Sequence, residues 1–236
     1  MIREMTDLLM PRECLVCGRR LGARESQLCI WCSADLPLTY YWERRHNPMA
    51  DRFNALLEDS RTDGVPMPYA AAAALLFYHR ESPYRRIPQA LKYEGNRAVG
   101  RRFAALLGRC LAAQPFWATV DLVLPVPMSP WRKWRRGYNQ AEVLAAVLAE
   151  ALGAPLRTDV LRSRRKFRSQ TALSAEERRN NVAGAFVLRR RVPAGHILLV
   201  DDTFTTGATL LACHQALREG LGPSPRISVA TLAVVE

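Results

Sequence analysis

A short apolar segment that ends in two carboxylates and a glycine turn constrains this chain most. Residues 197–200 are four consecutive apolar residues, which suits a strand buried on both faces of a sheet. Asp201 and Asp202 follow directly, and residues 205–209 read Thr-Thr-Gly-Ala-Thr where a helical pattern begins. Glycine lets the backbone approach a ligand closely, and the first turn of a helix presents unpaired N–H groups. The segment therefore predicts a cradle for a phosphate group.

Two carboxylates beside a phosphate cradle would repel the ligand unless they bind another part of it. Ionised carboxylates accept hydrogen bonds from the vicinal hydroxyls of a sugar. The acids and the hydroxyl-rich turn together therefore predict a site for a ribose 5-phosphate. In an open α/β sheet, such a ligand binds at the carboxyl ends of the strands. The alternative interpretation is an ordinary strand–turn–helix connection with a polar turn.

The rest of the chain after about residue 65 alternates strand-like and helix-like segments. The strand-like segments are residues 71–78, 120–126, 197–200 and 227–235, and the helix-like segments are 82–93, 98–113, 139–152 and 206–218. Continuous apolar strands separated by helices predict a mostly parallel sheet covered on both faces. The predicted fold class is α/β.

A second group of candidate binding residues follows the segment 120–126. Residues 124–128 read Leu-Pro-Val-Pro-Met, and they precede a basic run at 132–136 and Gly-Tyr-Asn-Gln at 137–140. Guanidinium groups bind phosphate oxygens in pairs, which suits a pyrophosphate. Asn139 is expected to cap the helix that begins there. The alternative is a solvated basic loop.

Four cysteines near the N-terminus form two Cys-x-x-Cys pairs: Cys14 with Cys17, and Cys29 with Cys32. This spacing is typical of a four-thiolate zinc site, and Gly18 suits the turn after the first pair. Disulfides would need an oxidising compartment, and residues 1–10 lack the apolar core of a signal peptide. An iron–sulfur cluster is the other alternative. Four thiolates leave no open coordination position, so zinc would have a structural role.

Charge and aromatic residues are each compatible with more than one kind of partner. The formal charge of +12 favours polyanionic partners, either phosphorylated small molecules or nucleic acid, although a solvated basic face is the alternative. Aromatic residues at 31 and 40–42 could stack on single-stranded bases, but a miniature core is the favoured interpretation. The longest apolar run, residues 70–77, is too short to span a bilayer, so we expect a soluble, cytoplasmic protein.

The order of the motifs carries a family resemblance. The segment ILLVDDTFTTGAT is similar to the phosphoribosyl-pyrophosphate signature of type I phosphoribosyltransferases. Pro-Val-Pro, Arg-Arg-Gly-Tyr-Asn-Gln, and Gln-Thr-x-Leu with Arg-x-Asn precede it, after the two cysteine pairs. In this order they resemble the ComF family, which includes ComFC-type competence proteins and GntX-type proteins. The resemblance implies a type I phosphoribosyltransferase fold in residues 65–236, preceded by a zinc ribbon and linker in residues 1–64.

The resemblance also implies site residues. Asp201 and Asp202 would be the catalytic acids that hold the ribose hydroxyls. The 5-phosphate would lie against the loop residues Thr203, Thr205, Thr206, Gly207, Ala208 and Thr209. The pyrophosphate side would be formed by Pro127, Met128, Arg136, Gly137, Asn139 and Gln140. Gln170 and Arg178 would lie in a mobile loop near the site.

Two functions follow as expectations. The first is binding of phosphoribosyl pyrophosphate with Mg²⁺, as a phosphoribosyltransferase-like protein linked to DNA uptake or nucleotide salvage, with enzymatic transfer left open. The alternative is a non-catalytic competence protein that handles single-stranded DNA through the phosphate pockets and basic surface, with Trp131 and Trp134 beside the basic residues. Competence-machinery proteins are further expected partners. No segment is clearly built to bind a base, so the sequence indicates no acceptor.

Overall fold

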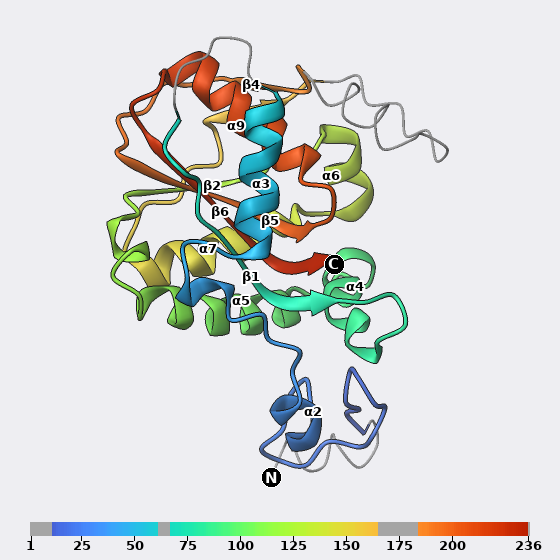
Figure 1. Ribbon diagram of the computed structural model, residues 1–236. Coiled ribbons are helices and arrows are strands. Elements are labelled where there is room, and N and C mark those ends of the chain that lie inside the picture. The colour runs from blue at the N-terminus through green and yellow to red at the C-terminus, as the bar shows by residue number, and fades with distance from the viewer. Residues whose placement is uncertain (1–10, 61–66, 165–183, 236) are drawn as a thin grey trace.

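A sheet of four parallel strands forms the centre of the computed structural model, which describes residues 11–60, 67–164 and 184–235 (Figure 1). Neighbouring strands pair in parallel throughout. In spatial order the strands are β1 (Ala72–Tyr78), β6 (Arg226–Val235), β5 (His196–Phe204) and β2 (Leu122–Pro125). The predicted α/β class and parallel sheet are confirmed.

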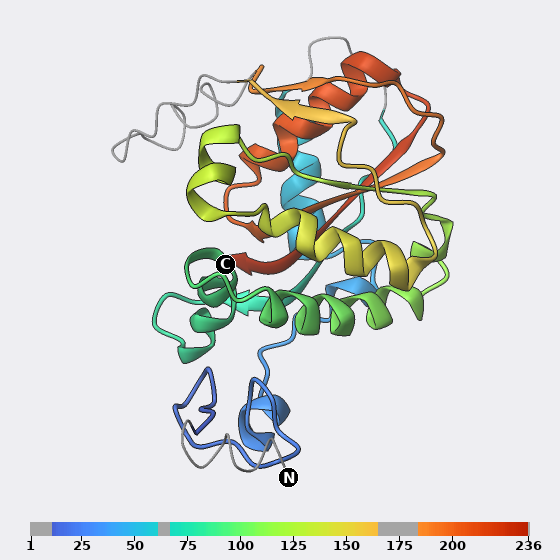
Figure 2. The same ribbon diagram turned by 180° about the vertical axis from the view of Figure 1, so that it is seen from behind.

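Helices cover both faces of this sheet (Figures 1 and 2). Because side chains alternate along a strand, Leu198 and Val200 of β5 belong to one apolar cluster, and Ile197 and Leu199 belong to another. The first cluster includes residues of α5 (Arg97–Ala112) and α7 (Gln140–Leu152). The second includes residues of α3 (Pro48–Asp59) and α9 (Ala208–Leu221). The apolar runs of the sequence are therefore buried from two sides, as predicted.

The ends of several helices follow from local sequence. Asn139 caps α7, because its Oδ1 atom accepts a hydrogen bond from the Ala141 amide at 3.1 Å. The expected helix at 82–93 is a short 3₁₀ turn, η2 (Pro83–Arg85), followed by α4 (Arg86–Tyr93). The basic run is helical rather than a loop: it forms α6 (Pro130–Arg136). Ser129 caps α6, and Gly137, with φ of +77°, ends it.

A small antiparallel pair was not predicted. It consists of β3 (Leu161–Ser163) and β4 (Phe186–Leu188), which are separated along the chain by the residues that the structure does not describe. Strand β4 packs against α9, where Leu188 lies close to Gly220. Three-residue strands carry too little periodicity to be recognised in a sequence.

The cysteine-bearing segment lies at one end of the molecule and includes α2 (Ile30–Ala34) (Figure 1). Its Leu28 shares an apolar cluster with Ile87 of α4, and the Tyr84 hydroxyl donates a hydrogen bond to the Cys32 carbonyl at 3.2 Å. Two short 3₁₀ turns, η1 (Tyr41–Glu43) and η3 (Trp117–Thr119), also flank the sheet. Within η1, Tyr41 and Trp42 are buried, but in the apolar clusters of the sheet rather than in a separate miniature core, whereas Trp31 and Tyr40 are exposed.

Helix α3, from the first part of the sequence, packs on the sheet. Phe53 is fully buried there, and Arg52 donates hydrogen bonds to the carbonyls of Val235 and Thr205, each at 2.8 Å. The boundary at residue 64 stays a prediction. In the part of the chain that the structure describes, no helix has the length and apolar character needed to cross a membrane.

Candidate functional site

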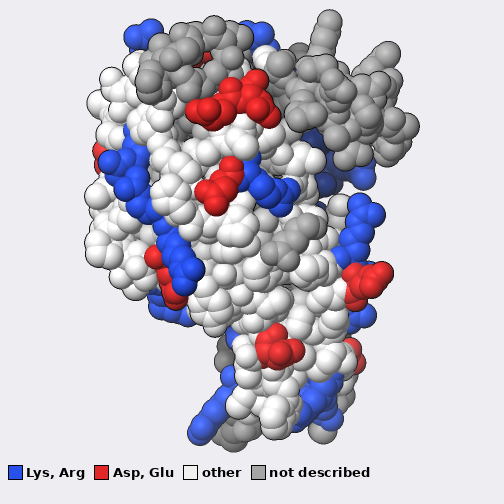
Figure 3. Space-filling view, viewed as in Figure 1, with Lys and Arg blue, Asp and Glu red and all other residues white. Residues whose placement is uncertain are grey.

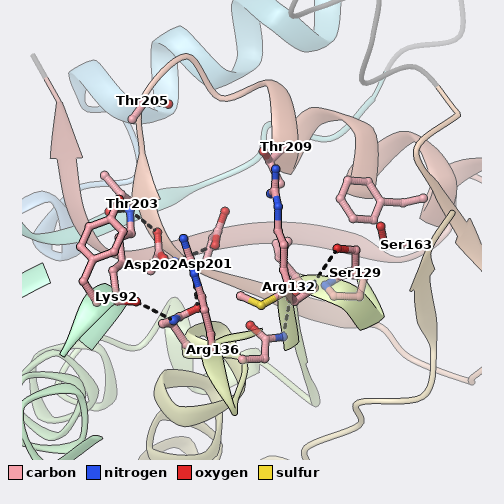
Figure 4. A pocket seen from close by; sticks show the side chains of 17 residues that line it. Lys92, Ser129, Arg132, Arg136, Ser163, Asp201, Asp202, Thr203, Thr205 and Thr209 are labelled. Atoms are coloured by element: carbon pink, nitrogen blue, oxygen red, sulfur yellow. Dashed lines mark hydrogen bonds and ion pairs between the residues drawn. The ribbon is translucent and has the colours of Figure 1, made fainter. Parts of the chain in front are cut away.

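A pocket of about 300 Å³ opens where β5 and β2 end (Figure 4). Its lining comes from five separate stretches of the chain, which the parallel sheet brings to one edge. The lining residues are Lys92, Tyr93, Val126, Pro127, Met128, Ser129, Arg132, Arg136, Asn139, Gln140, Ser163, Phe186, Asp201, Asp202, Thr203, Thr205 and Thr209. The volume is at the lower end of the range for small-molecule sites, which is about 300–1,000 Å³.

The structure brings most of the predicted site residues together in this pocket. From the acidic loop and the pyrophosphate side, the lining includes Asp201, Asp202, Thr203, Thr205, Thr209, Pro127, Met128, Arg136, Asn139 and Gln140. Four predicted residues lie outside the lining: Gly137, Thr206, Gly207 and Ala208. Gln170 and Arg178 lie outside the described residues. The roles assigned to all of these residues stay predictions.

The two acids are held in different ways. The Asp202 carboxylate accepts an ion-paired hydrogen bond from the Lys92 ammonium, with 2.9 Å between Oδ1 and Nζ. The Asp201 carboxylate accepts a hydrogen bond from the Asp202 amide at 2.8 Å. Burial and the adjacent Asp202 charge raise the pKa of Asp201 to about 7. The pair therefore changes its charge near neutral pH, and hydroxyl donors or a cation would favour its ionised form.

The loop predicted to bind the phosphate, residues 203–209, is shaped by contacts beneath it. Gly207 has φ of +77°, a left-handed conformation that favours glycine. A Cβ atom there would lie 2.7 Å from Leu56 Cδ1 of α3 and 2.9 Å from Phe204 Cζ of β5, so a larger residue would have to push these side chains aside. The Arg52 guanidinium holds the Thr205 carbonyl from the same side. Gly207 and α3 thus fix the loop from behind, while Thr205 and Thr209 face the pocket.

Helix α6 supplies the cationic wall. Arg132 and Arg136 are four residues apart, so they lie on the same face of the helix. Figure 4 shows the Arg132 side chain extending toward Thr209, at the start of α9. The Arg136 guanidinium donates a hydrogen bond to Gln140 Oε1 at 3.4 Å. Guanidinium groups on this wall and helix N–H groups on the other can contact two phosphates of one ligand.

Asn139 and Gln140 are almost completely buried, although they line the pocket. The Asn139 amide donates to the Val126 carbonyl at 2.9 Å, and its oxygen caps α7. Gln140 Nε2 donates to the Lys92 carbonyl at 3.4 Å. Asn139 therefore joins α7 to the segment after β2, and Gln140 joins α7 to the end of α4, so the two side chains hold this side of the pocket in shape.

Sequence reasoning missed several lining residues, and it named Arg132 only as part of the basic run. Lys92 lies near the end of α4, where a lysine is explained by the helix dipole, and nothing local connects it to Asp202. Phe186 and Ser163 come from the short strands β4 and β3. Tyr93 is 73% exposed at the rim, and the Arg136 guanidinium lies 5.6 Å from its ring centroid. An acid pair that lacks a local counter-charge was the available signal that a distant cation exists.

The four N-terminal cysteines form a second candidate site. Their sulfur atoms all lie within 4.8 Å of one another, and those of Cys17 and Cys29 are 3.8 Å apart. A tetrahedral metal with metal–sulfur bonds of about 2.3 Å places its sulfurs ~3.8 Å apart, so the cluster fits a tetrahedral metal ion. Gly18 turns the chain with φ of +74° and donates its amide to the Cys14 carbonyl at 2.9 Å. The predicted metal-binding arrangement of the four cysteines is confirmed.

Among the solved structures that the chain resembles are two proteins of low sequence identity. The glutamine phosphoribosylpyrophosphate amidotransferase of B. subtilis, complexed with ADP and GMP, is 21% identical, with a TM-score of 0.39 over 60% of this chain and 30% of that one. The orotate phosphoribosyltransferase of Aeropyrum pernix is 19% identical, with a TM-score of 0.31 over 62% of this chain and 61% of that one.

Comparison with known sequences finds relatives, although no protein-family model matches the chain. Competence protein F of Haemophilus influenzae is 34% identical over 149 residues, which are 60% of this chain and 64% of that protein. The DNA utilization protein YhgH of Salmonella typhi is 37% identical over 97 residues, 41% of this chain and 43% of that protein. Competence protein ComFC of Bacillus subtilis is 32% identical over 114 residues, 47% of this chain and 43% of that protein.

The chain spans less than two thirds of the length of these relatives. The names of two of them, Competence protein F and ComFC, match the family that the order of the motifs indicates. The chain is a relative of the Competence protein F and ComFC proteins, and the resemblance to the ComF family that its motifs indicate is confirmed.

Proposed function

We propose that this chain binds phosphoribosyl pyrophosphate together with Mg²⁺ in the pocket at the end of β5, as a phosphoribosyltransferase-like protein linked to DNA uptake or nucleotide salvage. The observation that carries the proposal is the convergence of three groups on one cavity: the acid pair, the threonines of the phosphate loop and the arginines of α6. A 5-phosphorylated ribose with a second anionic group is the ligand whose parts match these three groups. The names of the relatives support the link to DNA uptake.

Each part of the ligand has a proposed partner. The ribose hydroxyls donate to Asp201 and Asp202, and this binding favours the ionised form of Asp201. The 5-phosphate lies at the start of α9, against Thr205 and Thr209. The pyrophosphate faces the guanidinium groups of α6, which bind phosphate oxygens in pairs.

Magnesium belongs to this proposal through its chemistry. Mg²⁺ prefers oxygen ligands and retains several waters, and pyrophosphate and ribose hydroxyl oxygens supply such ligands beside the acid pair. When bound, it would neutralise charge on the leaving pyrophosphate. Transfer of the phosphoribosyl group would then need no protein nucleophile, because preplaced charges stabilise the leaving group and the cationic ribose. The acceptor of such a transfer is outside the proposal.

We propose zinc for the cysteine cluster and a structural role for it. Four thiolates with this spacing complete a tetrahedral shell, so zinc would fold the segment around the cysteines, within the proposed module and linker of residues 1–64 that precede the domain of residues 65–236. Thiolates that bind a metal must stay reduced, and this supports a cytoplasmic location. The competing iron–sulfur cluster would be recognised by its visible absorption, which zinc lacks.

The decisive experiment is titration calorimetry of the full chain with phosphoribosyl pyrophosphate, with and without Mg²⁺. We expect binding that needs Mg²⁺ and that is lost in the double variant Asp201→Asn, Asp202→Ala. Asp159→Asn is the control, because Asp159 forms its ion pair with Arg157 outside the pocket. Absence of heat under both conditions, confirmed by a second binding assay, would refute the proposal.

One observation favours a second candidate, the handling of single-stranded DNA. Trp131 and Trp134 of α6 are 61% and 82% exposed, and the Arg135 guanidinium lies 5.5 Å from the Trp131 ring centroid. Exposed aromatic rings beside cations are the elements on which unpaired bases stack. Net charge is a weaker indicator, because on the face in Figure 3 basic side chains lie in separate groups interrupted by acidic and uncharged residues.

This second candidate predicts a steep salt dependence. Affinity for a thymidine oligonucleotide should fall by roughly 0.7 log units per phosphate contact for each tenfold rise in salt. Trp134→Ala should weaken binding, since stacking contributes about 1–3 kcal/mol per base. If Trp134→Ala and Arg135→Ala leave both the affinity and its salt dependence unchanged, DNA does not bind at α6.

A further inference from the structure

Lys92 contacts both the acidic segment, residues 201–209, and the wall formed by residues 126–140, although it belongs to neither of these two motifs. Its ammonium lies 2.9 Å from Asp202 Oδ1 and donates to Thr203 Oγ1 at 3.0 Å. The Lys92 and Asp202 side chains are 24% and 15% exposed, so water screens this ion pair less than a surface pair. Figure 4 shows Lys92 beside Asp202 and Thr203, on the side of the pocket across from Ser163.

The backbone at the end of α4 accepts hydrogen bonds from the wall formed by residues 126–140. The Lys92 carbonyl accepts a hydrogen bond from Gln140 Nε2 at 3.4 Å, and the preceding carbonyl, that of Leu91, accepts one from the Tyr138 hydroxyl. Tyr138 is itself buried and lies beneath the Arg97 guanidinium, 4.6 Å from its ring centroid. Lys92 therefore extends from an anchored helix end, and its reach to Asp202 is set by that anchor.

The charges around Lys92 indicate what its ammonium does. Two adjacent carboxylates beside a phosphate cradle repel an anionic ligand, and a neighbouring ammonium offsets one of these two negative charges. The ammonium occupies one oxygen of Asp202, and a carboxylate has acceptor sites left for hydroxyl donors. An ion pair with this geometry also restricts the rotation of the carboxylate, so its free acceptor sites face a fixed direction.

We propose that Lys92 is a positioning residue for ribose recognition: it aims the Asp202 carboxylate at the ribose hydroxyls and offsets its charge so that a phosphorylated ribose can enter. This inference rests on the proposed function of the same pocket. It assigns Lys92 to discrimination between ribose and 2-deoxyribose, because the hydroxyls are the groups that the aimed carboxylates bind.

The test compares the affinities of the full chain for ribose 5-phosphate and 2-deoxyribose 5-phosphate by calorimetry. We expect the wild type to prefer ribose 5-phosphate by tenfold or more. Lys92→Met should weaken ribose 5-phosphate binding by about tenfold or more and bring the ratio of the two affinities close to one. Lys92→Arg should retain most of the preference, since it keeps a charged donor.

Arg157→Met is the matched control, because it removes a cation from a carboxylate 2.9 Å away at a place outside the pocket. It should leave both affinities unchanged. If Lys92→Met weakens both ligands equally and the ratio persists, Lys92 does not position the acids, and the inference is overturned. If the wild type binds neither these sugars nor phosphoribosyl pyrophosphate, the proposed function itself fails and takes the inference with it.

Discussion

The cysteine cluster and the pocket at the end of β5 use similar turns but differ in how their groups are arranged. In each, a glycine with positive φ reverses the chain: Gly18, at +74°, follows the first cysteine pair, and Gly207, at +77°, closes the acidic loop. In the cluster, four identical sulfur atoms converge within 4.8 Å and can complete the shell of one ion. In the pocket, groups of opposite charge line a cavity that stays open to a ligand.

This difference teaches where each region obtains its stability. The cysteine cluster joins segments that have little secondary structure, so we expect a bound metal to hold it together. The pocket is carried by the ends of buried strands, whose residues Leu199 and Val200 are completely inaccessible to water. A metal should therefore decide the folding of the first region, and apolar packing should decide that of the second. Three changes test this contrast.

The largest effect is expected from Cys14→Ser. Structural zinc contributes about 10–16 kcal/mol in zinc-finger peptides, so loss of one of four ligands should release the ion and unfold the region around the cysteines. Metal analysis should give one zinc for the wild type and none for the variant, and limited proteolysis should cut the variant within residues 11–35. The sheet should still unfold cooperatively in denaturant. Cys110→Ser is the control, since Cys110 lies on α5 outside the cluster; a variant at Cys14 that retains its zinc would contradict the contrast.

The opposite outcome is expected from Gly207→Ala. The left-handed conformation costs an alanine about 1–2 kcal/mol, and the contact of its Cβ with Leu56 and Phe204 adds about 1–3 kcal/mol of overpacking. Denaturant unfolding should show this loss of stability, and phosphoribosyl pyrophosphate affinity should fall while the zinc content stays at one.

Gly153→Ala separates the two contributions to that loss. Gly153 also has positive φ, +65°, but no described atom lies within 4 Å of the position of a Cβ there. This control should lose only the backbone part of the stability and keep its ligand affinity. Equal destabilisation of the two variants would mean that contact with α3 does not shape the loop.

The contrast also explains what could be predicted from the sequence. The cysteines lie within one short stretch, so their spacing alone indicates a metal site. The acidic segment is equally local, from Asp201 to Thr209. Its first four residues belong to strand β5 itself, so the apolar run before Asp201 fixes its position on the parallel sheet. Apolar periodicity likewise placed the principal strands and helices, because each buries a continuous face.

What could not be predicted depends on contacts between distant segments. Lys92 and Asp202 are 110 residues apart, and only the folded sheet brings them within 2.9 Å of each other. Helix α6 carries more basic residues than apolar ones, so its pattern did not indicate a helix, although its Ser129 cap and its terminal Gly137 were present in the sequence. The capping residues indicate a helix at this place, but the basic pattern between them favoured the interpretation as a loop.

The smallest of the three effects is a pH dependence confined to the sheet region. His214 of α9 is buried against Phe53, and its Nε2 atom has no hydrogen-bond partner among the described residues. Burial, with a smaller contribution from the Arg218 charge, lowers the pKa of His214 to about 3. The unfolded chain, with a histidine pKa of about 6.5, therefore binds the proton first, and stability falls as the pH drops below 6.5.

At pH 5 this difference amounts to about 2 kcal/mol, from roughly 1.5 pKa units at 1.36 kcal/mol each. His214→Leu should therefore lose about 2 kcal/mol less stability than the wild type between pH 7.5 and 5, as measured by denaturant unfolding. Asp201 has the opposite effect, because its raised pKa favours the folded state in acid, so the variant must be compared with the wild type at each pH. The exposed His46 provides the control His46→Leu, which should keep the acid sensitivity of the wild type. If His214→Leu keeps the acid sensitivity of the wild type too, acid acts on the sheet region through other groups.

Acid should act on the cysteine region by a different route, thiolate protonation and loss of the metal. Measuring the same pH dependence in a Cys14→Ser background would show whether the remaining acid sensitivity arises in this way.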